Sequence, residues 1–442
     1  MKNRKWRLTS FQIIMGGFLI IIFMGTILLM LPVSSKNAGG ASLADALFTA
    51  TSATCVTGLV VQDTATYWTL FGKIIILVLI QIGGMGVITA AVLFSVILHK
   101  KIGLAQRSIM QESISASQVG GIVRLTIFII RTMIFIELAG ACLLFPSFHK
   151  EYGLVKAIGY SVFHSISAFC NAGFDLMGEK EHFSSLLSYG GDTLLNLTVI
   201  FLILAGGIGF KTWEDMKIHR HHLKKYSIQS KMVLAATGIL VIIPAVYFYF
   251  GEFSEMPFKD RILASLFQTV APRTAGFNTV NLSDMSETGI TLVIILMLIG
   301  GASGSTAGGM KMTTVAVMMA AALSISRQKK DVVAFNRRID ADTVFKAGTV
   351  FVMYNMLFIF SGLIISKVEH LPILTCLFET SSAIATVGLT LGITPGLSMI
   401  SRTLLVILMF LGRVGGLTII FAALSEHSSN EGRYPVEKVS VG

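Results

Sequence analysis

The sequence predicts an all-α membrane protein built from four tandem helix–pore-loop–helix repeats around a pseudo-fourfold pore. Three observations lead to this prediction: an apolar composition, eight long apolar segments, and one loop motif that occurs four times. Of the 442 residues, 53% are hydrophobic and only 13% are charged, whereas soluble domains are about 25% charged. A water-soluble α-helical protein of this composition would expose large apolar patches, so that class is disfavoured.

Eight segments are apolar enough for membrane-spanning helices, which need about 20 residues each. Five of them carry no charge, namely Thr9–Ser35, Ile74–Leu98, Thr193–Phe210, Met232–Gly251 and Ala347–Ser366. Three contain one or two charges, namely Leu125–Phe148, Thr288–Ser326 and Thr403–Leu424. The first segment is too long for a cleaved signal peptide and no cleavage site follows it.

The distribution of Lys and Arg predicts the orientation, because these residues favour the cytoplasmic side. With the N-terminus inside, 22 of the 35 Lys and Arg residues fall on inner segments and 10 on outer ones. We therefore expect a multi-pass protein of the cell membrane, surrounded by lipid, with both termini in the cytoplasm. The net charge of +11 is then a property of the inner face, and no nucleic acid partner is needed to explain it.

Each outer loop contains a second, shorter apolar stretch. The four stretches are Ala41–Thr54, Ala157–Cys170, Asp260–Pro272 and Leu371–Ala385. About 14 residues of helix cover only about 21 Å, which is too short to span a bilayer. Helix-start signals at Ser42, Asp260 and Pro372 support short helices. We expect four re-entrant pore loops, at residues 41–63, 157–178, 260–281 and 371–394.

The same tip follows each short helix: SATCVTGL (52–59), SAFCNAGF (167–174), VAPRTAGF (270–277) and SAIATVGL (382–389). The tips align on Gly58, Gly173, Gly276 and Gly388, which are 115, 103 and 112 residues apart. Self-similarity of this kind indicates copies of one structural unit. We expect repeats at 1–110, 111–225, 226–335 and 336–425, followed by a C-terminal tail at 426–442.

A second motif recurs in the helix after each tip. It reads IGGMG (82–86), AGGIG (205–209), IGGAS (299–303) and LGRVG (411–415). A single glycine pair is explained by close helix packing. The first glycine of the motif follows the tip glycine by 25, 33, 24 and 24 residues, and its recurrence in each unit supports the fourfold repeat.

Four tips around one axis can coordinate a cation with backbone carbonyls that replace its water shell. Glycine permits the dihedral angles that such a backbone needs. The tips carry no carboxylate, so a carbonyl site for a dehydrated monovalent cation fits better than a Ca²⁺ or Mg²⁺ site. The predicted filter residues, with K⁺ at their carbonyls, are Val56, Thr57, Gly58, Leu59, Asn171, Ala172, Gly173, Phe174, Thr274, Ala275, Gly276, Phe277, Thr386, Val387, Gly388 and Leu389.

The tips TCVTGL, CNAGFD, PRTAGFNT and ATVGLT resemble those of the Trk/Ktr/HKT superfamily of K⁺ transporters over nearly the whole chain. The resemblance implies K⁺ uptake, no enzymatic activity and no covalent cofactor, with Na⁺ as a candidate activator. It also implies a homodimer and a cytosolic nucleotide-binding regulatory ring of the KtrA type. Superfamily members with Ser at the first filter glycine lean toward Na⁺, and Gly58 favours K⁺. Transport that conducts or is coupled to Na⁺ is the alternative.

The segment Thr288–Ser326 contains GGASGSTAGGMK at residues 300–311. Five glycines and three hydroxyl residues cannot maintain a lipid-facing helix, so we expect a break that gates the pore. Close helix packing is the alternative. A Walker A reading fails because Met310 stands where Lys is required. The predicted gate residues are Gly300, Gly301, Gly304, Gly308, Gly309, Lys311 and Arg413.

Arg413 occupies the position of the second glycine in the pair. A charge at membrane depth normally faces the protein interior or water. On the pore axis it would repel K⁺ and could bind carbonyls of the gate segment. The alternative is an ion pair with Glu137, while Arg131 and Glu137 could also pair with each other.

Two other function classes receive little support. An intramembrane enzyme would need a Ser–Lys, His–Glu or Asp–Asp constellation within the spans, and none has usable spacing. A carrier for an organic solute usually has two related halves rather than four similar pore loops.

Overall fold

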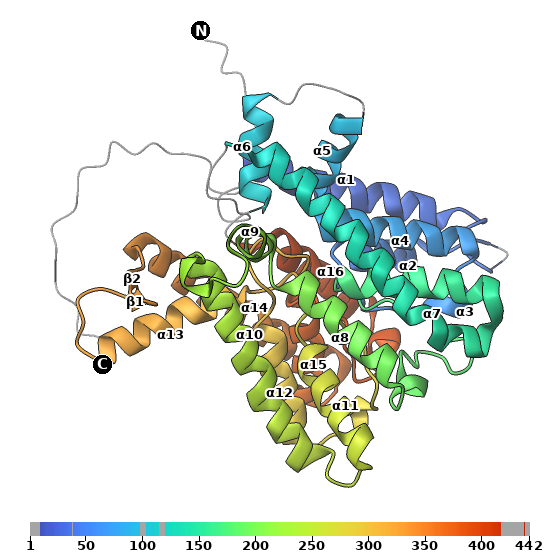
Figure 1. Cartoon of the computed structure of the whole chain (residues 1–442). Helices are drawn as coiled ribbons and strands as arrows, with labels where there is room; N and C mark the ends of the chain where they lie inside the picture. The colour runs from blue at the N-terminus through green and yellow to red at the C-terminus, as the bar shows by residue number, and fades with distance from the viewer. Residues whose placement is uncertain (1–8, 38, 98–102, 115–119, 417–436, 438–442) are drawn as a thin grey trace.

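The structure is a computed structural model that describes residues 9–416, except 38, 98–102 and 115–119, together with residue 437. Most of the predicted tail at 426–442 therefore lies outside the described residues. The described chain is almost entirely helical (Figure 1). The helices of the first half are α1 (Ser10–Met30), α2 (Leu43–Thr54), α3 (Thr64–Tyr67), α4 (Leu70–Met85), α5 (Val87–Ile97), α6 (Leu104–Ile114), α7 (Ile122–Phe169), α8 (Thr193–Gly207) and α9 (Phe210–His219).

The second half contains α10 (Ile228–Tyr247), α11 (Phe258–Val270), α12 (Glu287–Leu298), α13 (Met312–Ser326), α14 (Ala341–Glu369), α15 (Ile373–Ile384) and α16 (Met399–Val414). A small antiparallel hairpin, β1 (Val333–Ala334) and β2 (Arg337–Arg338), joins α13 to α14. Figure 1 shows α5 and α6 together at one end of the molecule, and α13 leading away from the bundle to the hairpin. The buried apolar side chains form two large clusters, dominated by residues 29–213 and 248–409.

Within the part of the chain that the structure describes, four helices are long and apolar enough to cross a membrane. They are Ser10–Met30, Ile122–Phe169, Ile228–Glu252 and Ala341–Glu369. The number rises to six if each of two bent helix pairs counts as one span.

Short helices form where the sequence predicts them. Ser42 caps α2, because its hydroxyl accepts a hydrogen bond from the Asp45 amide at 3.1 Å. Prolines precede α11 and α15 as their N-caps, at Pro257 and Pro372. The expected helices at 125–148 and 157–170 both form within α7, where a kink at Gly153 with φ +70° and ψ 177° separates them.

Two of the predicted spans are bent. The segment predicted at 74–98 ends as α4 at Met85 and turns by 100° into α5. The segment predicted at 193–210 likewise turns by 93° from α8 into α9. The cause is the last glycine of the recurring motif: Gly86, Gly209 and Gly415 have φ of +82°, +86° and +91°, a region that side chains other than glycine rarely adopt. The chain thus breaks at this motif in all four units, and not only in the third.

The first glycine of the motif lies against the end of the short helix of the same unit. A Cβ at Gly83 would overlap the carbonyl oxygen of Thr54, the last residue of α2. At Gly206 and Gly412 it would overlap the carbonyl oxygens of Phe169 and Ile384, the last residues of α7 and α15. The C-terminal end of each of these short helices therefore packs closely against the following helix, which has a glycine at the point of contact.

We predict that Gly83→Ala lowers the thermal unfolding midpoint of the detergent-purified protein. The new Cβ would lie 2.9 Å from the Thr54 carbonyl carbon, and overpacking of this kind costs about 1–3 kcal/mol. The matched control is Gly238→Ala in α10, where nothing lies within 4 Å. Helix propensity alone makes that change neutral or slightly stabilising. Equal midpoints for the two variants would contradict the proposed packing role of Gly83.

Candidate functional site

The four aligned tip glycines lie against one another in a closed ring. A Cβ at Gly58 would lie 3.0 Å from the Gly173 Cα, and one at Gly173 would lie 3.0 Å from the Gly276 Cα. A Cβ at Gly276 would lie 3.3 Å from the Gly388 Cα, and one at Gly388 would lie 2.9 Å from the Gly58 Cα. The ring follows the order of the sequence, so segments more than 100 residues apart in the sequence meet at one place.

The backbone has the same unusual conformation in all four tips. The glycines have φ between +69° and +95°. The residues two positions earlier, Val56, Asn171, Thr274 and Thr386, have φ between +51° and +72°. Non-glycine residues in this region cost about 1–2 kcal/mol each. Such strain persists only where the surrounding structure fixes the backbone.

Hydrogen bonds to the preceding short helix provide this support. The amides of Thr57, Ala172 and Val387 each donate to a carbonyl five residues earlier at 2.8 Å. In the third tip, the Ala275 and Gly276 amides donate to Ala271 at 3.0 and 3.3 Å.

All sixteen predicted filter residues are buried. Several of their side-chain oxygens have no hydrogen-bond partner among the described residues: Thr57 Oγ1, Asn171 Oδ1, Thr274 Oγ1 and Thr386 Oγ1. Buried polar atoms are nearly always satisfied in folded proteins. Each tip therefore buries one polar side-chain oxygen next to its glycine or two residues before it.

Two buried ionisable side chains interact with the backbone that follows two of the tips. They are His164 in the second unit and Glu379 in the fourth, and each lies nine residues before the tip glycine. His164 Nε2 interacts with the Leu176 amide at 3.3 Å, and Glu379 Oε1 accepts from the Leu391 amide at 3.1 Å. Leu176 and Leu391 each lie three residues after the glycine. Sequence reasoning missed this pair, although an ionisable residue inside a short apolar helix was a usable signal.

A third residue was also missed, although it lies within the quoted CNAGFD motif. Asp175 follows Gly173 by two residues and is partly buried. Burial, with a smaller contribution from the Asp63 carboxylate, raises the pKa of Asp175 to about 7 despite the hydrogen bond from the Met177 amide. One carboxyl group with a raised pKa therefore borders the ring.

The expected break in the third unit is present, between the end of α12 at Leu298 and the start of α13 at Met312. We call residues 299–311 the gate segment. It contains the predicted residues Gly300, Gly301, Gly304, Gly308, Gly309 and Lys311. A Cβ at Gly309 would lie 2.7 Å from the Ala385 Cα, and one at Gly300 would lie 3.4 Å from the Thr274 Cγ2. The gate segment therefore lies directly against the third and fourth tips.

Hydrogen bonds join the gate segment to the second unit. The Ala302 amide donates to the Gly207 carbonyl at 2.8 Å, and the Phe210 amide donates to the Gly304 carbonyl at 2.7 Å. The Thr306 hydroxyl donates to the Phe169 carbonyl at 3.0 Å. The segment is thus fastened to the bend between α8 and α9.

Arg413 connects the gate segment to two other units. From α16 its guanidinium donates to the carbonyl of Thr306 and to those of Gly83 and Gly84, the last at 3.3 Å. The alternative ion pair with Glu137 is not among the ion pairs of the described residues, and Glu137 accepts hydrogen bonds from the Gln81 side chain at 3.1 and 3.2 Å. Arg413 also lines a cavity of about 290 Å³ together with Lys311 and Gly304.

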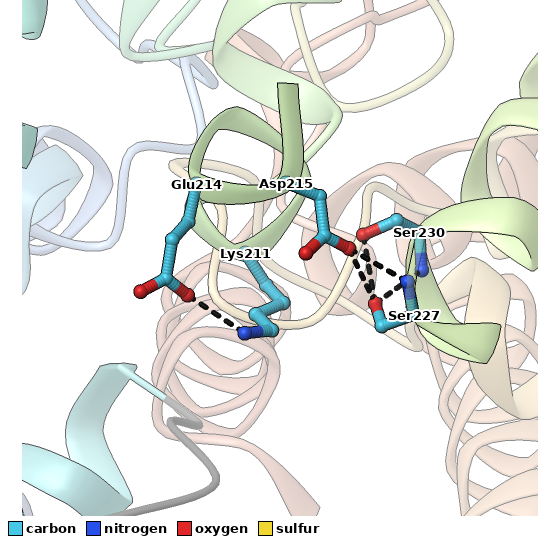
Figure 2. A network of polar contacts seen from close by, with 5 residues as sticks. All are labelled: Lys211, Glu214, Asp215, Ser227 and Ser230. Atoms are coloured by element: carbon cyan, nitrogen blue, oxygen red, sulfur yellow. Dashed lines mark hydrogen bonds and ion pairs between the residues drawn. The ribbon is translucent and has the colours of Figure 1, made fainter. Parts of the chain in front are cut away.

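A polar network fixes α9, the helix that begins at the gate contact (Figure 2). Asp215 accepts hydrogen bonds from the Ser227 amide at 2.9 Å and the Ser227 hydroxyl at 2.7 Å. The Ser227 hydroxyl also caps the first turn of α10 by accepting from Ser230. Lys211 and Glu214 form an ion pair at 2.7 Å on the same helix. The middle of α9 is therefore held to the N-terminal end of α10.

The chain is similar to known cation transport proteins over nearly its whole length. A family model described as TrkH, cation transport protein, matches residues 5–432. The chain is 40% identical to the Ktr system potassium uptake protein B of Bacillus subtilis, over 99% of this chain and 98% of that protein. It is 38% identical to the potassium/sodium uptake protein NtpJ of Enterococcus hirae, over 100% of this chain and 99% of that one.

Among solved structures, the potassium transporter TrkH from Vibrio parahaemolyticus has the same fold. The TM-score is 0.70 at 20% identity, and the alignment covers 95% of this chain and 86% of that one. The match to the family model extends over nearly the whole sequence and includes all four tips. The chain therefore belongs to the TrkH family of membrane cation transport proteins.

Proposed function

We propose that this protein is the ion-conducting membrane subunit of a potassium uptake system, and that K⁺ crosses at the ring of tip glycines. The observation that carries this proposal is the closed contact of Gly58, Gly173, Gly276 and Gly388. One backbone conformation occurs four times around a common centre, which is the arrangement that a carbonyl filter requires.

The chemistry of the ring supports a monovalent cation. A Cβ at Gly58, Gly276 or Gly388 would overlap a carbonyl oxygen of the neighbouring tip, so main-chain oxygens crowd the centre. No carboxylate side chain belongs to the sixteen filter residues. Such a site suits K⁺ better than a divalent ion, which prefers carboxylate ligands.

Selectivity for K⁺ over Na⁺ is part of the proposal. The relatives are named for potassium uptake, and one is named for potassium and sodium. Glycine occupies the filter position in all four tips, which favours K⁺. Transport that conducts or is coupled to Na⁺ is the second candidate, supported by the name of the Enterococcus relative.

We predict that Gly276→Ser reduces the K⁺ over Na⁺ preference by about ten-fold. The new side chain would overlap the Val387 carbonyl oxygen and meet the Gly388 Cα at 3.3 Å. A displaced carbonyl layer costs about 1–3 kcal/mol, by analogy with other unsatisfied buried polar groups. The measurement is ⁸⁶Rb⁺ uptake into proteoliposomes with K⁺ or Na⁺ as competitor.

The control is Gly16→Ser in α1, where nothing lies within 4 Å of the glycine. It should keep the competition profile of the wild type. If Gly276→Ser also keeps it, at normal yield and with normal thermal stability, then K⁺ does not pass at this ring.

The gate segment completes the proposal. It lies directly against two tips and is fastened by hydrogen bonds to the second and fourth units. Arg413 supports this role, because its positive charge stands beside the segment and binds the Thr306 carbonyl. We infer that the segment and the guanidinium together close the path below the ring.

We predict that Arg413→Ala raises K⁺ flux in the absence of any partner by about ten-fold, because a barrier charge and its bridge to Thr306 are removed. Deletion within residues 304–309 should act in the same direction. Arg413→Lys is the matched variant, since it keeps the charge but lacks the planar guanidinium that spans from Thr306 to Gly83 and Gly84. Its flux should remain low. Uptake into proteoliposomes measures all three. Folded Arg413→Ala protein with abolished flux would show that the arginine and the segment are only structural.

Control of the gate is proposed to come from a cytosolic nucleotide-binding ring, with the membrane subunit as a homodimer. Two B. subtilis relatives are named as parts of a Ktr system. The segments expected at the inner face, 211–231 and 327–346, are rich in Lys and Arg. Both connect to the gate segment, one through α9 and Phe210 and the other through α13.

A further inference from the structure

A groove of about 610 Å³ runs between α10 and α13. Small apolar residues form its walls, among them Ala236 on α10, and Ala316 and Ala320 on α13. Larger apolar side chains at its rim are exposed: Ile239 by 57% and Met319 by 58%. Both helices belong to the apolar segments of the chain, so the groove opens toward lipid.

The two ends of the groove differ in chemistry. Arg327 and Lys329 line one end. Both are exposed, and neither forms an ion pair with any residue that the structure describes. Ile299 and Met312 line the other end. A ligand that fills this groove therefore needs an anionic group at one end and a long apolar body.

We propose that the groove binds an anionic phospholipid of the inner leaflet. Its phosphate lies at Arg327 and Lys329, and an acyl chain lies between α10 and α13. Both cations fall on the segment that the distribution of Lys and Arg assigns to the cytoplasmic side. Basic pockets beside membrane helices on this side bind anionic headgroups. A second copy of this chain fits less well, because it is itself basic, with a net charge of +11.

The acyl end of the groove reaches the gate segment. Met312 packs with Val233 and Ala302 in a small buried cluster to which Ala236 and Ile299 also contribute. The Met312 amide donates to the Gly301 carbonyl at 3.0 Å, next to the hydrogen bond from Gly300 to Met310 at 2.9 Å. A bound chain would thus fix the spacing of α10 and α13 at the point where the gate segment begins and ends.

Any effect of the lipid on ion flow rests on the proposed function of the gate segment, whereas the lipid-binding site itself does not.

The binding test uses native mass spectrometry of the delipidated membrane subunit. Phosphatidylglycerol, phosphatidylcholine with the same acyl chains, and inorganic phosphate are added separately. We expect phosphatidylglycerol to bind about ten-fold more tightly than phosphatidylcholine, and inorganic phosphate not to compete.

Two pairs of variants separate the groove from the general membrane surface. Ala320→Trp fills the groove, whereas Ala322→Trp places the same side chain at an exposed position of α13 outside it. Only the first should abolish the preference for phosphatidylglycerol. Arg327→Gln should weaken its binding about five-fold, and Lys330→Gln, outside the groove, should leave it unchanged. If the tryptophan variants fold poorly, the comparison of Arg327→Gln with Lys330→Gln still tests the proposal.

Amide hydrogen exchange of residues 299–312 tests the connection to the gate segment without any ion flux. Phosphatidylglycerol should slow this exchange in the wild type and in Ala322→Trp, but not in Ala320→Trp. Equal binding of both lipids, equal behaviour of the two tryptophan variants, or full competition by inorganic phosphate would overturn the proposal. The proposal would also be overturned if Ala320→Trp changed the oligomeric state but kept the preference for phosphatidylglycerol. A second copy of the chain would then be the occupant of the groove. Failure of the filter variants to change selectivity would refute the proposed function but leave these results unaffected.

Discussion

Backbone contact among four glycines is the constraint on which the rest of the structure depends. Gly58, Gly173, Gly276 and Gly388 can meet only because none has a Cβ, and each brings a strained, positive-φ tip with it. The C-terminal ends of the short helices must therefore lie close together and face one centre. The helices that follow must approach these ends closely, which explains the second set of glycines at Gly83, Gly206 and Gly412. The two sets of glycines thus bring the four tips together at one place.

The departures from fourfold symmetry gather around the gate segment. In three units the recurring motif ends in a glycine at which the helix ends, whereas in the third unit residues 299–311 follow the helix at that point. In the fourth unit, Arg413 replaces a small residue and spans from Thr306 to Gly83 and Gly84. A charged side chain is costly at membrane depth. Its three carbonyl partners from two other units explain how the fold accommodates it.

The periodic and apolar features of the sequence predicted much of the fold. The short helices formed at the expected places because length and start signals are local properties, and the break at 300–311 was visible as a run of glycines. The bends after α4 and α8 were missed, because Gly86 and Gly209 lie inside uninterrupted apolar segments and a single glycine does not reveal its φ. The roles of His164 and Glu379 were also missed, since their partners lie 12 residues away across a tip. The Arg413 contacts depend on units more than 100 residues apart, which spacing alone cannot assign.

Anomalous diffraction from crystals grown in Rb⁺ tests the central claim most directly. Rb⁺ resembles K⁺ in charge and size and can be located independently of the protein density. The account predicts an anomalous peak on the axis enclosed by Gly58, Gly173, Gly276 and Gly388, which weakens when Rb⁺ is replaced by Na⁺. Rb⁺ bound only elsewhere, for example beside Asp63 and Asp175, with none inside the ring, would contradict it.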